Sequence, residues 1–186
     1  EKEARRTVFD YAPHLKGLSL GMPLQQVLSI YENAVLVEAN HPLYQAAFDA
    51  LLDILGQRSP AIETPSLGQI YIGLNGLTSS YNEMTYLTNV LLNDVPTTLT
   101  PRIGVSCGKF PAYVAARRAS PGHIMKTPVP ADTFLASASI NLFPVSQEIK
   151  RRLISFGLHT MGDVVSVGLG PLQAQFGPAG TRIWHL

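Results

Sequence analysis

The sequence predicts an α+β protein in which a small sheet packs against helices and a separate group of short helices follows. Three observations lead to this prediction. In Ser66–Gly73, apolar residues alternate with other residues at every second position around a bend. This pattern indicates two short strands. Residues 44–55 place apolar side chains at helical spacing. After Pro130, glycine and proline separate short helical segments that show no strand pattern.

The composition favours a chain with a substantial core. Of 186 residues, 46% are hydrophobic and 15% are charged, which excludes a disordered chain. The net charge of +1 means that any DNA contact needs a local basic patch. A single cysteine, Cys107, cannot form an internal disulfide, so we expect a reducing, cytoplasmic compartment. We expect no membrane span, because no apolar run approaches 18 residues.

The first third of the chain is expected to hold helices and one strand. Charged residues 1–12 predict a short helix that Pro13 ends. Pro23 suits the start of a second helix. An apolar run at 34–37 predicts a strand. The clearest helix opens at His41 and ends at Gly56, which is a typical C-terminal cap.

The middle of the chain alternates strands and helices. Strands are expected at 61–64, 69–74, 102–106 and 123–126, with Pro65 breaking the first of them, and helices at 82–94 and 110–117. With the strand at 34–37 and the helix that opens at His41, these elements include the order β-α-β-β-α-β, which is that of the ferredoxin-like fold. The expected result is a central antiparallel sheet with two helices on one face.

The last part is predicted to be entirely helical. Ser146 is a good N-cap for a helix over 147–155. Thr160 caps another helix, with Asp163 completing a capping box. Two further short helices are expected at 173–176 and 181–184.

Several motifs, taken in order, resemble the Y-family (translesion) DNA polymerases. The matching segments are Leu20-Gly21-Met22-Pro23, Ser59-Pro60-Ala61-Ile62-Glu63, Ser66–Ile72, Gly104-Val105-Ser106, Pro121-Gly122 and Phe156–Asp163. The resemblance implies finger-like helices over 1–38, a palm-like α+β domain over 39–133 and a small helical thumb over 134–186. It also implies a piece of a longer protein, whose first palm strand lies upstream.

The chain departs from the family pattern at the groups that handle the nucleotide. The family's palm bend carries an Asp-Glu pair that holds Mg²⁺, and the matching positions here are Gly68 and Gln69. Tyr11 is kept from a Tyr-x-x-Arg pair, but His14 replaces the arginine. We expect Tyr11 and His14 to belong to a remnant of the family's nucleotide pocket. Its other positions are Tyr71, Lys109 and Tyr113.

These departures resemble the catalytically deficient, ImuB-type branch of the family. That resemblance implies a DNA-repair adaptor in damage-induced mutagenesis, with no catalytic residue, bound metal or other cofactor in this chain. The implied partners are DNA, a translesion polymerase and a sliding clamp, all in the bacterial cytoplasm. Two alternatives stay open: an active polymerase that uses Mg²⁺ ligands outside this chain, and a scaffold that no longer binds DNA.

Two groups of basic residues are candidates for contact with the DNA backbone. One is the helix that Ser146 opens, which carries Lys150, Arg151 and Arg152. An exposed helix N-terminus can also accept a phosphate. The other group is Arg117 and Arg118 on the expected palm helix. For both groups a solvated helix face is the alternative.

Overall fold

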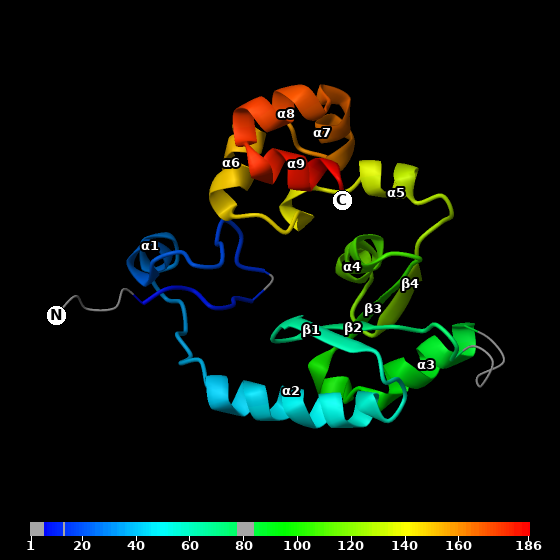
Figure 1. Cartoon of the computed structure of the whole chain (residues 1–186). Helices are drawn as coiled ribbons and strands as arrows, with labels where there is room; N and C mark the ends of the chain where they lie inside the picture. Colours follow the sequence, from blue (N-terminus) through cyan, green and yellow to red (C-terminus); the bar gives the residue numbers. More distant parts are fainter. Residues whose placement is uncertain (1–5, 13, 78–83) are drawn as a thin grey trace. The chain divides into compact units, whose positions relative to one another are not determined.

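The computed structural model describes residues 6–12, 14–77 and 84–186, and it confirms the α+β class. The chain divides into two compact units, Glu1–Asp49 and Ala50–Leu186. Figure 1 shows the elements of each unit, and the two are described separately below.

The first unit is built on a small core beside helix α1 (Leu24–Ile30). Val8, Leu18 and Val27 form this core. The amide of Val8 donates to the Met22 carbonyl at 2.9 Å, and the amide of Gly21 donates to the Val8 carbonyl at 2.8 Å. The helix expected over 1–12 is therefore wrong for residues 6–12, because extended pairing satisfies these amides and buries Val8. Residues 1–5 lie outside the described part.

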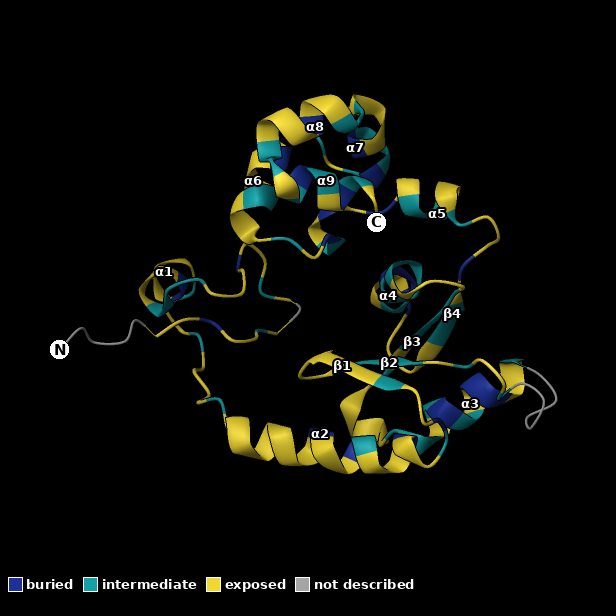
Figure 2. Ribbon diagram, in the orientation of Figure 1, coloured by how far each residue is buried: buried dark blue, intermediate teal, exposed yellow. Residues whose placement is uncertain are grey.

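The strand expected at 34–37 is also wrong. Residues 34–37 form no ladder in the described part of the chain, and Val35 and Val37 are 88% and 83% exposed. An apolar run favours a strand, but pairing depends on a partner that the local sequence does not specify. The helix that follows, α2 (His41–Gly56), has the predicted bounds. Figure 2 shows it exposed along most of its length.

A hairpin of β1 (Ile62–Ser66) and β2 (Gln69–Ile72) opens the second unit's sheet structure. The strands are antiparallel, and the register shifts between Glu63 and Ser66. Pro65 lies inside this irregular stretch, so the expected break at Pro65 is wrong: a residue without an amide is tolerated where the ladder is interrupted. The end of α2 and helix α3 (Met84–Asp94) supply a small core of leucines: Leu51, Leu55, Leu87 and Leu91.

A strand-helix-strand unit follows the short turn η1 (Thr97–Leu99). It consists of β3 (Arg102–Val105), α4 (Lys109–Arg118) and β4 (His123–Lys126). The two strands are parallel, as a helical crossover requires. The expected single antiparallel sheet is thus wrong in detail, because the described residues form two separate two-stranded sheets. Helix α4 lies against β3 (Figure 1), where Gly104 permits the close approach.

The remaining residues are helical, as predicted. The elements are α5 (Asp132–Ala136), η2 (Ile140–Leu142), α6 (Gln147–Ser155), α7 (Met161–Val167), α8 (Leu169–Phe176) and α9 (Pro178–Trp184). Ser146 caps α6, and Thr160 and Asp163 form the predicted capping box at α7. The last two helices begin earlier than expected, since Pro171 and Pro178 fit their first turns.

The core of this helical part includes α4. Val114 of α4 is fully buried in a cluster with residues of η2 and α6–α9, among them Ile140, Leu153, Leu172 and Ile183. The shared core joins the strand-helix-strand unit to the C-terminal helices. No helix in the described ranges has the length and hydrophobicity needed to cross a membrane.

Candidate functional site

The end of the β1–β2 hairpin holds the two positions that the sequence singled out. Leu67 and Gly68 form the turn, and Gly68 has φ 79°, a left-handed conformation that glycine adopts without strain. Gln69 begins β2 and pairs with Ser66. Its side-chain amide donates a hydrogen bond to the Tyr71 hydroxyl at 3.0 Å. Of the two positions, only Gln69 has a polar side chain, and its amide already donates to Tyr71.

An ion pair joins the hairpin to the start of α4. Glu63 lies opposite Tyr71 in the ladder. Its two carboxylate oxygens are 2.6 and 2.7 Å from the Lys109 Nζ. Both side chains are 62% exposed, so the pair contributes little stability. Glu63 is a site residue that sequence reasoning missed, since its partner is 46 residues away and no local pattern links the two.

Tyr71 lies at the centre of this polar cluster. Burial raises the pKa of its hydroxyl, and the hydrogen bond from Gln69 opposes that effect. Tyr113, Lys109 and Glu63 also act on the pKa of Tyr71, each with a smaller effect, so all lie close to it. The structure thus brings together four predicted site residues and Glu63; we call this set the hairpin cluster: Glu63, Gln69, Tyr71, Lys109 and Tyr113.

The two predicted residues of the first unit have other surroundings. Tyr11 packs against the small core of Val8, Leu18 and Val27. His14 is exposed.

The hairpin cluster does not fit a magnesium ion. Mg²⁺ prefers oxygen ligands and is usually held by carboxylates. Gly68 offers no side chain, Gln69 is bonded to Tyr71, and the Glu63 carboxylate is neutralised by Lys109. In residues 6–12, 14–77 and 84–186, no three His, Cys, Asp or Glu side chains are grouped so as to hold a metal ion. The hairpin cluster by itself therefore supplies no ligand set for Mg²⁺.

The three consecutive basic residues of α6 do not share one face of the helix. Successive residues on an α-helix are rotated by about 100°, so Lys150 and Arg152 lie on nearly opposite flanks. The Lys150 Nζ donates to the Asn141 carbonyl at 2.7 Å. Arg152 donates to the Gln175 carbonyl at 3.0 Å and lies over the Phe176 ring. They do not form one continuous patch.

Lys150 and Arg117 form a small cationic site. Burial lowers the pKa of Lys150, and the nearby positive charge of Arg117 lowers it further. No carboxylate forms an ion pair with either residue in the part of the chain that the structure describes. Ser146 is exposed and caps the same helix by accepting a hydrogen bond from the Ile149 amide at 3.4 Å. An anion near both cations would relieve their repulsion.

Arg118 has a different environment from its neighbour. Its guanidinium donates to the Phe134 carbonyl at 3.1 Å and to the Ser137 hydroxyl at 3.0 Å. It also lies 4.7 Å from the centroid of the Phe134 ring. These contacts favour a structural link between α4 and α5.

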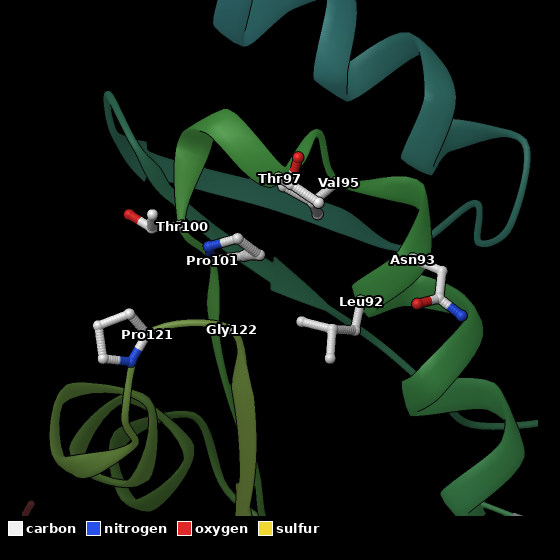
Figure 3. Close-up of a pocket in the computed structure, with 8 residues that line it drawn as sticks. All are labelled: Leu92, Asn93, Val95, Thr97, Thr100, Pro101, Pro121 and Gly122. Atoms are coloured by element: carbon white, nitrogen blue, oxygen red, sulfur yellow. The ribbon is translucent and has the colours of Figure 1, made fainter.

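A depression of about 310 Å³ lies where α3 ends and β3 and β4 begin (Figure 3). Its lining is neutral: Leu92, Asn93, Val95, Thr97, Thr100, Pro101, Pro121 and Gly122. No predicted site residue lines it. Without a cation it offers no counter-charge for a phosphate.

The structure resembles solved Y-family polymerases. DinB from Sulfolobus solfataricus aligns with a TM-score of 0.69 and 20% identity, over 91% of this chain and 52% of that one. A DinB family error-prone DNA polymerase from the same organism aligns with a TM-score of 0.73 and 21% identity. This alignment covers 90% of this chain and 52% of the polymerase. At this identity the likeness shows the fold alone.

Sequence relatives align over nearly the whole chain. DNA polymerase IV of Mannheimia succiniciproducens is 28% identical over 185 residues, covering 96% of this chain and 52% of the relative. DNA polymerase IV of Pasteurella multocida is 26% identical over 181 residues, covering 94% of this chain and 50% of the relative. The chain therefore spans about half the length of the curated relatives it matches. The model of the impB/mucB/samB family matches residues 9–117, which is more than half of the chain. The chain accordingly belongs to the impB/mucB/samB family, a Y-family DNA polymerase family.

Proposed function

We propose that this chain is part of a non-catalytic, ImuB-type member of its family, which binds the DNA backbone and recruits translesion-synthesis partners. It would act in the bacterial cytoplasm during damage-induced mutagenesis. A translesion polymerase and a sliding clamp are the partners proposed.

The observation that carries this proposal is the chemistry of the hairpin cluster. Two-metal phosphoryl transfer requires carboxylates that hold the ions near the reacting phosphate. At the hairpin end, Gly68 supplies no ligand and Gln69 donates its amide to Tyr71. The nearby Glu63 carboxylate is paired with Lys109. The polar groups satisfy one another, which suits a surface that does no nucleotidyl transfer.

The cationic site of Lys150 and Arg117 supports DNA binding. Two cations lie close together, and the exposed cap Ser146 opens the helix that carries Lys150. A backbone phosphate matches this arrangement, because it offers one negative charge without sequence information. We therefore expect weak, sequence-independent, salt-sensitive affinity.

Primer extension tests the non-catalytic part. The native protein that carries this chain is incubated with primer-template DNA, the four dNTPs and Mg²⁺, beside DNA polymerase IV of Pasteurella multocida as the positive control. We expect no template-dependent extension. Extension that disappears when the template is omitted would overturn the proposal.

A salt series tests the DNA-binding part. Fluorescence anisotropy is measured on primer-template DNA for the wild type, Lys150→Gln and Arg117→Gln. Each substitution should lower the slope of log affinity against log salt by about 1. Arg182→Gln, an exposed cation on α9, is the charge-matched control and should leave the slope unchanged. No binding at low salt would instead support a protein-interaction scaffold.

A DNA-directed DNA polymerase is the second candidate function. The observation in its favour is that the curated relatives named DNA polymerase IV align over nearly the whole chain. In that case the metal ligands would come from outside this chain. The same primer-extension experiment decides between the two candidates.

A further inference from the structure

Helix α6 carries a second surface on the flank away from Lys150. We define the α6–α8 surface by Phe156, Phe176, Arg151 and Arg152. Phe156 is 56% exposed. Its ring meets Phe176 edge to face, with 6.0 Å between centroids. An exposed phenylalanine beside arginines is typical of protein interfaces, where aromatic residues and arginine are enriched.

A shallow depression adjoins the two rings. About 300 Å³ in volume, it is lined by Glu148, Arg151, Arg152 and Ser155, which form one stripe along α6. Arg152 belongs to both features, because its guanidinium lies 5.1 Å from the centroid of the Phe176 ring. The rings and the depression therefore share Arg152.

Both arginines retain free donors. Each guanidinium has five N–H groups. Arg152 donates to the Gln175 carbonyl, and Arg151 donates to the Gln147 carbonyl at 3.4 Å. Neither forms an ion pair within the described ranges. With Glu148 counted, the depression keeps a net positive charge of one.

We propose that the α6–α8 surface docks an acidic segment of a partner protein, with an apolar side chain of that segment against Phe156 and its carboxylates on Arg151 and Arg152. This deepens the partner-recruiting part of the proposed function and does not depend on DNA binding. Charge complementarity selects the acidic character, and the exposed ring selects the apolar anchor.

The same features disfavour a nucleic acid at this surface. Stacking of bases needs an open aromatic face. Arg152 lies over one face of the Phe176 ring, so that face is not open to a base. Glu148 lies in the same depression and would repel a continuous phosphate backbone.

A peptide-binding experiment tests the proposal. The probe is a short fluorescein-labelled peptide of aspartates around one Leu-Phe pair, titrated with the native protein. Two control peptides replace either the Leu-Phe pair by Ala-Ala or the aspartates by Asn. We expect saturable binding of the probe alone, with backbone NMR shifts concentrated at Ser155, Phe156 and Phe176.

Substitutions in the protein sharpen the test. Phe156→Ser and Arg152→Gln should each weaken peptide binding about tenfold, which corresponds to about 1.4 kcal/mol. Glu148→Gln should strengthen it, since it removes the one opposing charge. Lys150→Gln, on the other flank of α6, is the matched control and should change DNA affinity while leaving peptide affinity unchanged.

The outcomes separate the two proposals. Loss of DNA binding with intact peptide binding contradicts the DNA part of the proposed function alone. The docking proposal is overturned if the probe does not bind, if its shifts lie elsewhere, or if Phe156→Ser leaves affinity unchanged. It is also overturned if a single-stranded oligonucleotide binds this surface in a Phe156-dependent manner.

Discussion

At the scale of single residues, neighbouring side chains of the same type have unlike environments. Arg117 lies close to another cation, Lys150. Arg118, the next residue, donates two hydrogen bonds, one to Phe134 in α5 and one to Ser137, which follows that helix. One step along a helix changes the direction of a side chain by about 100°. Arg117 and Arg118 are adjacent in the sequence, yet each has a separate set of neighbours in the structure.

Substitution of Arg118 tests its structural role. Arg118→Lys keeps the charge but loses the planar fork that reaches Phe134 and Ser137 together. We expect Arg118→Lys and Arg118→Gln to lower the free energy of unfolding by similar amounts, about 1 kcal/mol each. Urea denaturation measures the free energy of unfolding of each variant. Arg117→Gln is the control, because it removes the same charge as Arg118→Gln. Full stability in Arg118→Lys would show that charge alone matters at this position.

At the scale of elements, the unit β3-α4-β4 depends on a close contact. A side chain at Gly104 would overlap the Ala112 carbonyl oxygen and the Ala116 amide of α4. Both are backbone atoms, so α4 would have to move away from β3. The glycine is needed for the packing of this helix on this strand.

Gly104→Ala should therefore destabilise the chain. We expect a loss of about 2 kcal/mol in the free energy of unfolding, the usual range for overpacking. Gly170→Ala is the matched control, because a Cβ there meets nothing within 4 Å and the residue lies in α8. That control should be neutral or stabilising by helix propensity. Equal denaturation midpoints for both variants would contradict the close contact.

The capping box of α7 gives the chain a pH-dependent element. The Asp163 carboxylate accepts hydrogen bonds from the amides of Thr160 at 2.8 Å and His159 at 2.9 Å. These bonds hold the pKa of Asp163 below its ordinary value. Because the folded-state pKa is the lower one, the stabilisation is complete above the ordinary carboxyl range and is lost as the pH falls through the folded-state pKa.

Asp163→Asn tests this linkage. At neutral pH the variant should unfold at lower urea than the wild type, and the gap should close as the pH falls below the ordinary carboxyl range. Asp132→Asn at the start of α5 is the control, since its carboxylate accepts no hydrogen bond within the described residues. A gap between wild type and Asp163→Asn that stays constant with pH would rule out this linkage.

At the scale of the whole molecule, the second unit has a core that crosses the expected palm–thumb boundary. Val114 lies on α4, yet it is fully buried among residues of η2 and α6–α9. Helices that share one core are expected to unfold together. The palm-like and thumb-like parts are named for their resemblance, whereas this core joins them physically.

Val114→Ala tests that coupling. Removing two buried methyl groups should cost about 2 kcal/mol. Hydrogen exchange should show amides of α4 and of α6–α7 losing protection together. Ala50–Leu186 should also unfold in one transition. Faster exchange confined to α4 would mean that the two parts are independent.

The sequence by itself determined the features that depend on near neighbours. The bounds of α2 and α6, the caps at Ser146 and Thr160, and the turn at Gly68 all follow from residues a few positions apart. The order of motifs was also sufficient to indicate the family. Such signals are local, so the chain carries them before it folds.

Only the tertiary structure decided what depends on distant partners. Residues 34–37 carry a strand pattern but remain unpaired in the described part, and β3 and β4 are parallel. The Glu63–Lys109 pair joins residues 46 positions apart, and Lys150 and Arg152 point to opposite flanks of one helix. Strand pairing, ion pairs and the direction of a side chain are set by which elements pack together, and no local pattern encodes that packing.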